Sequence, residues 1–321
     1  MKTNDTESFY IDINKASTIL LVGNGISQAY GACSWSDVLK SLSTNKDVKI
    51  NSDEIKNIPN PLKAVILSDD HLDKKMKDLS VSFSNYSPSQ EEQEQWKMIA
   101  TLPVLGILTT NYSYEIEKSL NKDFVVSVGR RSSFRKHTTF EGEVKGKRLL
   151  ATYMQPLSNS LPVWYIHGEA GISDSMTIGH YYYGNLIAKA QRRISQILRK
   201  YHDCKKTGKL FEVETWVDLF MLCNVNIVGL GLDFSEFDLW WLLNCKKRHF
   251  PETKVDWYDV NIDISKKKLA ETYCINFHNT EVLFPIADKD TWFKNYYSSL
   301  ISQIKVSLIN ELKENACCDV M

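Results

Sequence analysis

Apolar, β-branched segments alternate with amphipathic segments along most of this chain, and this alternation is the feature that most constrains its fold. Helical patterns lie between most of the apolar runs, as in residues 186–201, where apolar side chains fall on one face. Continuous apolar strands that alternate with helices are typical of a parallel sheet covered on both faces. The pattern therefore predicts an α/β fold, a Rossmann-like parallel sheet flanked by helices. The apolar runs are residues 18–22, 104–110, 124–128, 163–168, 225–232, 254–262 and 280–286.

Two regions interrupt the alternation. Residues 43–100 contain no good strand and predict a mostly helical insertion after the first strand–helix unit. Residues 129–161 hold seven Lys or Arg side chains against two glutamates, and they predict a basic loop or hairpin. A second basic run, 192–209, lies on and beyond the polar face of a helix, and we interpret both runs as solvated charge rather than an anion site. A C-terminal helix is predicted over 290–313, with Asp290 as its N-cap.

Composition excludes several function classes. The 321 residues carry no formal net charge, which argues against a direct nucleic-acid partner, and no apolar run approaches the length of a membrane span. The N-terminus lacks an apolar signal core, so we expect a cytoplasmic protein. Seven scattered cysteines without a Cys-x-x-Cys pair argue against a disulfide framework and a zinc ribbon, and we expect no metal. We interpret residues 1–321 as one domain.

Small or polar residues follow four of the predicted strands, where a parallel sheet collects its ligands. Each feature has a plain structural explanation when it is taken alone. The glycines could form tight turns, Asn111 could be a helix N-cap, and His167 could be a satisfied core histidine. The four segments are Gly23-Asn24-Gly25-Ile26-Ser27, Thr109-Thr110-Asn111-Tyr112, His167-Gly168 and Gly229-Leu230-Gly231.

Together and in this order, the four segments resemble the motifs of sirtuin-like NAD-consuming proteins. Sirtuins carry Gly-Ala-Gly-Ile-Ser, Thr-Gln-Asn-Ile-Asp, His-Gly and Gly-Thr-Ser-Leu at the corresponding places. The chain is more similar still to the sirtuin-like NAD hydrolases of bacterial anti-phage defence, in which Thr-Thr-Asn-Tyr is common. In those proteins a glycine and a tryptophan follow the first loop, as Gly31 and Trp35 do here, and an Asp-Leu pair follows the later glycine, as in Asp238-Leu239. The motifs span about residues 18–243.

The chain departs from the deacetylating sirtuins at several places. Their zinc cysteines are missing, and Cys33-Ser34-Trp35-Ser36 replaces their Pro-Asp-Phe-Arg segment. Ser113 stands where the family usually has Asp, and Gly231 replaces a serine that contacts phosphate in sirtuins. Together these departures favour NAD hydrolysis over peptide deacetylation.

The resemblance implies that NAD+ is bound as a substrate and that nicotinamide is cleaved from it. Nicotinamide departs neutral, so the reaction needs no general acid, unlike ordinary glycoside hydrolysis. Asn111 would bind the ribose hydroxyls or the attacking water, and His167 would act as the general base. Thr110 and Ser113 would lie beside Asn111 in the same site.

The same resemblance implies how the rest of NAD+ would be bound. The pyrophosphate would lie on the amides of Gly23, Asn24 and Gly25, and Ser27 could add a hydroxyl. Gly229 and Gly231 would contact the cofactor through their backbone. The adenosine ribose would reach Asp259 or Asn261. The tyrosines at 181–183 would either wall the nicotinamide pocket or pack in the core.

An unregulated NAD hydrolase would drain the cell that makes it, so the resemblance also implies control by a homo-oligomer or by a partner protein. The expected role is the NAD-depleting effector of an abortive-infection system. Two other functions remain open: a sensor that binds NAD or ADP-ribose without catalysis, and a zinc-less deacylase or ADP-ribosyltransferase. A dehydrogenase is disfavoured, because Gln28 stands where the dinucleotide fingerprint has its third glycine.

Overall fold

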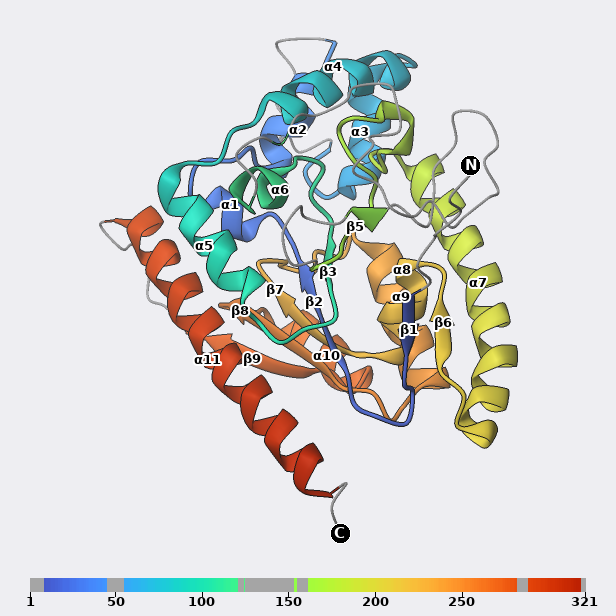
Figure 1. Cartoon of the computed structure of the whole chain (residues 1–321). Helices are drawn as coiled ribbons and strands as arrows, with labels where there is room; N and C mark the ends of the chain where they lie inside the picture. The colour runs from blue at the N-terminus through green and yellow to red at the C-terminus, as the bar shows by residue number, and fades with distance from the viewer. Residues whose placement is uncertain are drawn as a thin grey trace, which may run out of the picture.

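The computed structural model describes residues 9–44, 55–120, 124, 153–154, 161–281 and 288–318. Its centre is a seven-stranded sheet in the order β4-β5-β3-β2-β7-β8-β9 (Figure 1). Six strands are parallel, and β4 (Tyr153–Met154) pairs antiparallel with β5 at one edge. The parallel strands are β2 (Thr18–Val22), β3 (Ile107–Thr109), β5 (Val163–Tyr165), β7 (Asn224–Val228), β8 (Val255–Val260) and β9 (Asn276–Thr280).

The strand order places a ligand crevice between β2 and β7. Numbered along the chain, the six parallel strands lie in the spatial order 3-2-1-4-5-6, which is that of doubly wound dinucleotide-binding sheets. Strand order reverses where β2 pairs with β7, with Val22 opposite Val228. Ligands bind outside the carboxyl ends of the strands at such a reversal. The prediction of an α/β fold with a parallel sheet flanked by helices is confirmed.

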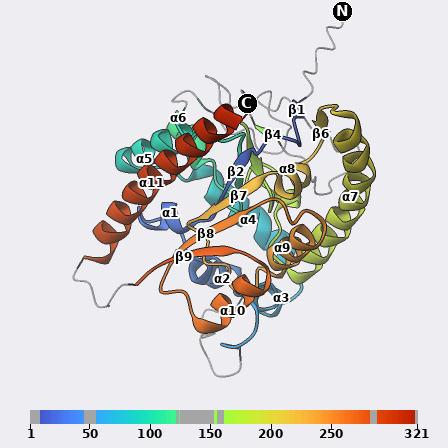
Figure 2. The same cartoon turned by 90° about the horizontal axis from the view of Figure 1, so that it is seen from below.

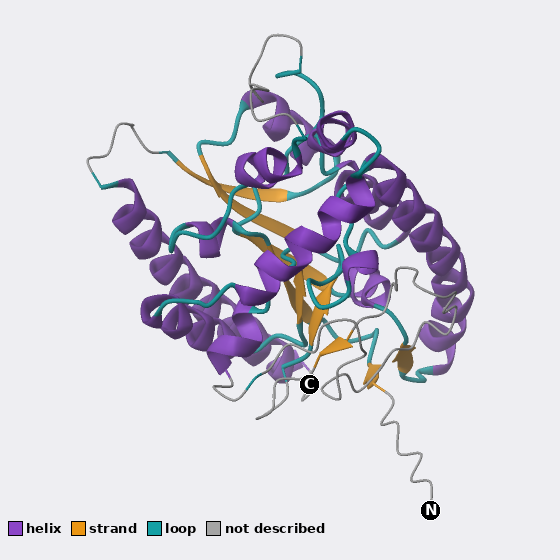
Figure 3. Ribbon diagram, turned by 90° about the horizontal axis from the view of Figure 1, so that it is seen from above, coloured by secondary structure: helices purple, strands orange, loops and turns teal. Residues whose placement is uncertain are grey.

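Side chains of β2 alternate between two apolar cores, because successive residues of a strand point to opposite faces. Ile19 and Leu21 pack with α7 (His180–Thr207), α8 (Trp216–Leu222), α9 (Phe237–His249) and α10 (Ile264–Thr272). Leu20 and Val22 pack with α5 (Gln90–Ala100), α6 (Glu115–Leu120) and α11 (Lys289–Cys318). Figure 2 shows α5 and α11 on one side of the sheet and α7 and α9 on the other. Viewed from above in Figure 3, helices surround the strands.

The helices α2 (Trp35–Leu42), α3 (Asn60–Ser68) and α4 (Leu72–Asn85) lie over the carboxyl ends of the strands (Figure 1), and a third apolar cluster holds them there. It joins these helices to buried residues that include Tyr112 and Met176. The short α1 (Gly25–Gln28) connects β2 to this layer, and the 3-10 turn Ser173–Ser175 contacts α4. A separate antiparallel ribbon, β1 (Phe9–Ile11) with β6 (Phe211–Val213), lies outside the main sheet.

Two helices extend beyond their predicted bounds. The predicted residues 186–201 lie inside α7, which ends at Thr207 and is capped by Gly208 in a left-handed conformation with φ 68°. The predicted residues 290–313 lie inside α11. The N-cap prediction is wrong, because Asp290 lies inside the first turn. Asp288 instead accepts a hydrogen bond from the backbone N–H of Thr291 at 3.1 Å.

Other predictions meet the structure only in part. The last strand that the structure describes is β9, which overlaps the predicted strand 280–286 only at Thr280. Residues 282–286 lie outside the described part. The predicted strand 124–128 and basic loop 129–161 also lie outside it, apart from Phe124, β4 and Leu161. The interpretation of 192–209 as solvated charge is wrong for Arg193, which is buried in an ion pair with Asp218 at 2.7 Å. No helix in the described ranges is both long and apolar enough to cross a membrane.

Candidate active site

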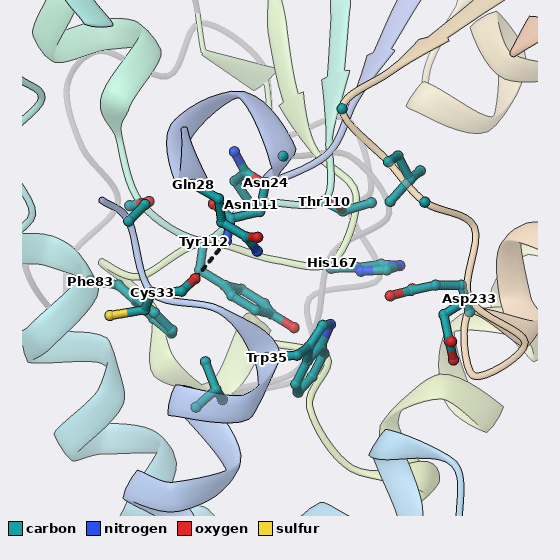
Figure 4. A pocket seen from close by; sticks show the side chains of 18 of the residues that line it. Asn24, Gln28, Cys33, Trp35, Phe83, Thr110, Asn111, Tyr112, His167 and Asp233 are labelled. Atoms are coloured by element: carbon teal, nitrogen blue, oxygen red, sulfur yellow. Dashed lines mark hydrogen bonds between the residues drawn. The ribbon is translucent and has the colours of Figure 1, made fainter. Parts of the chain in front are cut away.

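A cavity of about 530 Å³ opens at the carboxyl ends of β2, β3, β5 and β7 (Figure 4). Its size is in the usual range for a small-molecule or cofactor site. Trp35 and Val38 of α2 and Phe83 of α4 line it from the helical layer above the sheet. Eight of the twelve predicted site residues line it as well: Asn24, Gly25, Thr110, Asn111, Ser113, His167, Gly229 and Gly231.

The loops that follow β2 and β7 are bonded to each other. The backbone N–H of Gly23 donates to Val228 O at 3.0 Å, and that of Gly25 donates to Gly229 O at 2.7 Å. A Cβ atom on Gly23 would lie 2.5 Å from Gly229 O, so only glycine permits this approach. Two of the three amides predicted to hold the pyrophosphate are therefore already bonded to the end of β7 and the residue after it in this conformation.

Asn111 follows β3 and is held by a carboxylate of the next helix. Its Nδ2 donates to Glu115 Oε1, and its backbone N–H donates to Thr109 Oγ1 at 3.1 Å. Asn111 Oδ1 is buried and has no hydrogen-bond partner among the described residues. The side chain is therefore not a helix N-cap. Its amide oxygen can accept a hydrogen bond from a ligand hydroxyl or a water.

Glu115 was not a predicted site residue, yet it connects two that were. It is fully buried, and burial raises the pKa of its carboxyl to about 7. Hydrogen bonds from Ser113 and Asn111 oppose this shift, because they stabilise the ionised form. The hydroxyl of Ser113 thus acts on the site by holding down the pKa of Glu115, in addition to lining the cavity.

Further buried carboxyls lie behind Asn111. Glu117 Oε2 accepts a hydrogen bond from Tyr165 Oη at 2.5 Å, and Glu169 Oε2 accepts one from Tyr114 Oη at 2.7 Å. Burial raises the pKa of Glu117 to about 8, and the charges of Glu115 and Glu169 add to the shift. Neither Glu117 nor Glu169 lines the cavity.

His167 follows β5 and contacts a carboxylate from the first turn of α9. Its Nε2 lies 2.9 Å from Asp238 Oδ2, and both side chains are buried. A carboxylate can only accept at this distance, so Nε2 carries a ring hydrogen. Tyr183 packs edge-on against the ring, with centroids 5.4 Å apart. His167 is thus a bonded, buried histidine that also lines the cavity.

Glu236 lies two residues before Asp238 and lines the cavity beside His167. Burial raises the pKa of its carboxyl to about 7, and the nearby His167 and a hydrogen bond from Trp35 oppose the shift. No sequence pattern pointed to Glu236 as a site residue. Asp238 was identified only as part of the Asp-Leu pair that resembles the family, and no function was predicted for it.

Four predicted site residues do not line the cavity: Gly23, Ser27, Asp259 and Asn261. Ser27 is buried, and its Oγ has no partner among the described residues. Asp259 lies near the cavity edge, because its Oδ2 is 3.7 Å from the position of a Cβ on Gly231. Burial raises the pKa of Asp259 to about 6. Asn261 is exposed and has φ 50°.

The three adjacent tyrosines do not wall the cavity. Tyr183 is fully buried behind His167, whereas the side chain of Tyr181 is 71% exposed. Tyr182 donates to Asp73 of α4. Their role is therefore packing and the joining of α7 to the helical layer.

No protein-family model matches the chain, and no curated protein matches its sequence. Inference about its activity therefore depends on the cavity and on the groups that line it.

Proposed function

We propose that this protein is an NAD+ glycohydrolase that cleaves NAD+ to nicotinamide and ADP-ribose. One observation carries the proposal. Asn111 and His167 follow the neighbouring strands β3 and β5 and line the same cavity, at the strand-order reversal where such sheets bind nucleotides. An amide oxygen and an imidazole together suit the hydrolysis of a bond to a cationic pyridinium, because this leaving group departs neutral and needs no general acid.

The chemistry needs few groups. The bond between the ribose and the pyridinium breaks with its electron pair moving to the ring, so nicotinamide leaves neutral. Asn111 Oδ1 would accept a hydrogen bond from a ribose hydroxyl or from the attacking water. His167 Nδ1 would take the proton of that water as its oxygen bonds to the anomeric carbon. Asp238 at Nε2 holds the ring in the tautomer that this step requires.

The pyrophosphate contact differs from the one inferred by resemblance. Gly23 donates to the last residue of β7 and Gly25 donates to Gly229 just after it, so their amides do not point to a bound anion in this conformation. Among the described residues that line the cavity, Lys266 is the one cation, and its Nζ donates to Gly231 O at 2.7 Å. We place the pyrophosphate between Lys266 and the loop at 229–231, and the adenosine ribose near Asp259.

The wider role that we propose is that of an NAD-depleting effector in anti-phage defence. In this proposal α3, α4 and α5 form a helical insertion in a sirtuin-like domain that lacks a zinc ribbon. A homo-oligomer or a partner protein would restrain the activity until infection, in the cytoplasm of the cell. Expression of the chain with its genomic neighbours, followed by NAD+ measurement after phage challenge, tests this role.

The enzymatic proposal is tested by chromatography of NAD+, nicotinamide and ADP-ribose after incubation with the purified chain and its candidate activator. Asn111→Ala and His167→Ala should each abolish turnover and leave the circular dichroism spectrum unchanged. His278→Ala is the matched control, since His278 also lies 2.9 Å from an aspartate but does not line the cavity. Turnover that survives in both active-site variants would overturn the proposal. ADP-ribose binding without turnover in every condition would support a sensor instead.

A further inference from the structure

His167, Glu236 and Asp238 form a compact buried group. One nitrogen or oxygen atom of each side chain lies within 4.8 Å of the corresponding atoms of the other two. Their exposed fractions are 2%, 7% and 1%, so the group is shielded from bulk solvent. His167 and Glu236 line the cavity, which gives a small solute a route to all three side chains.

Two oxygens of this group lack a protein partner. Glu236 Oε2 and Asp238 Oδ1 are buried and form no hydrogen bond with any described residue. A buried carboxylate oxygen left without a partner is costly, and such atoms usually bind a proton, a water or a cation. Because these oxygens lie beside an imidazole nitrogen, the three atoms together form a ligand set for a metal cation.

We propose that His167, Glu236 and Asp238 bind a divalent cation of the zinc class and that the bound cation inhibits the hydrolysis. One imidazole and two carboxylates are ligands that Zn²⁺ accepts, and an imidazole favours it over Mg²⁺ or Ca²⁺. Three protein ligands leave a fourth tetrahedral position for a water. Binding by itself does not depend on the proposed function, but the inhibition does.

Inhibition follows from the two nitrogens of one ring. A cation at Nε2 takes the lone pair of that nitrogen, and a neutral imidazole then carries its hydrogen on Nδ1. A ring in that tautomer cannot accept a proton from water. Without the cation, a neutral ring that donates from Nε2 to Asp238 has Nδ1 as its basic atom. Cation binding and general-base use of His167 therefore exclude each other.

A second histidine–aspartate pair provides an internal comparison. His278 Nε2 lies 2.9 Å from Asp256 Oδ1, the same separation as in the buried pair. That pair is on the surface, with side chains 48% and 23% exposed. No third ligand joins it within the part of the chain that the structure describes. It should therefore not bind zinc, although the histidine–aspartate contact is alike.

The binding test is calorimetric titration of the full chain with Zn²⁺. Because Cys33 is exposed at the cavity and thiolates bind zinc, the titrations use a Cys33→Ser background. One Zn²⁺ per chain should bind, with affinity lost in Asp238→Asn and lowered at least about tenfold in Glu236→Gln. His278→Ala should leave the titration unchanged. Co²⁺ in place of Zn²⁺ should bind without a thiolate charge-transfer band.

Each outcome separates the two proposals. Absence of zinc binding, an unchanged titration in Asp238→Asn, or a thiolate band with Co²⁺ would overturn the site. Hydrolysis by the wild type should fall as Zn²⁺ binds and recover when a chelator removes it. Hydrolysis that persists with zinc bound would overturn the inhibition. If the chain never hydrolyses NAD+ but still binds zinc through Asp238, the site stands and the proposed function fails.

Discussion

The amide of Asn111 donates through Nδ2 to the carboxylate of Glu115. This contact leaves Oδ1 of Asn111 as a buried acceptor without a partner among the described residues. Because the carboxylate can only accept when ionised, it fixes which end of the amide faces Glu115. The orientation of the predicted catalytic amide is thus set by a residue that does not line the cavity.

Replacement of Glu115 by Gln should therefore impair catalysis more than folding. A glutamine can donate to Asn111 Oδ1, which lets the amide flip and removes the acceptor from the cavity. We expect kcat to fall by roughly tenfold to a hundredfold, the range for loss of a supporting hydrogen bond. The melting temperature should hold or rise, because a buried carboxyl becomes neutral. Steady-state kinetics and thermal denaturation check both; unchanged kcat would contradict this view of Asn111.

Replacement of Asp238 by Asn should lower kcat and leave KM for NAD+ nearly unchanged. The new amide can donate to Nε2 of His167, which would move the ring hydrogen to Nδ1 and remove the base. A loss of about a hundredfold or more is expected for a wrong tautomer. Asp233→Asn is the control, because Asp233 also lines the cavity but only accepts from Ser235 at a turn. An equal loss of kcat in both variants would show that the negative charge at the cavity matters, rather than the position of the ring hydrogen on His167.

Lys266 should contribute to NAD+ binding rather than to the chemical step. Lys266→Met keeps the aliphatic stem and removes the charge, so the pyrophosphate would lose its one cationic neighbour in the described cavity lining. We expect KM to rise by about tenfold, as for one charge-assisted hydrogen bond, with kcat within about twofold of the wild type. A drop in kcat at unchanged KM would place the pyrophosphate elsewhere.

Gly25→Ala should be strongly destabilising. The added Cβ would lie 2.6 Å from Tyr297 Oη and 2.7 Å from Gly229 O, so the two loops would have to separate. We expect a loss of about 1–3 kcal/mol in the free energy of unfolding, typical of overpacking. Gly184→Ala in α7 is the matched control, since its Cβ would meet no atom within 4 Å. There, alanine should stabilise by about 0.5–1 kcal/mol through helix propensity. Denaturant titration of both variants checks the contrast.

Stability should also depend on pH through Glu117. Its pKa in the folded protein is about 8, raised by burial from 4.5. The folded state thus holds a proton that the unfolded chain has lost, so this contribution to stability is complete below pH 4.5 and disappears as the pH rises to about 8. Glu117→Gln should flatten the pH dependence of unfolding free energy in this window by up to about 1 kcal/mol per pH unit. An identical slope in wild type and variant would argue against the shift.

The sequence predicts those parts of the fold that depend on local burial. β2 occupies residues 18–22 as predicted, because all five side chains are buried and none can face water. β9 was placed too late along the chain, because Asn276–Thr280 contains one large apolar residue. Its conformation depends on the ladder with β8 rather than on its own side chains. Such an edge strand carries little local signal.

The same distinction applies to the site. Asn111 and His167 were recognisable because each follows an apolar strand. Asp238 lies 71 residues after His167, and its approach to the ring depends on how α9 packs after β7. Likewise, no local pattern tells whether the amides of Gly23 and Gly25 face a ligand or the neighbouring strand. The structure shows that they are bonded to Val228 at the end of β7 and to Gly229 just after it.

The mutual bonding of the β2 and β7 loops has a consequence for substrate entry. The crevice cannot widen by parting these strands without breaking the Gly23–Val228 and Gly25–Gly229 hydrogen bonds. The helices α2, α3 and α4 pack above the strands through an apolar cluster that also contains Tyr112 and Met176, and they take no part in these two hydrogen bonds. Because Asn111 and His167 follow strands of the same sheet, a solute that enters beneath these helices would meet both side chains without any parting of β2 from β7.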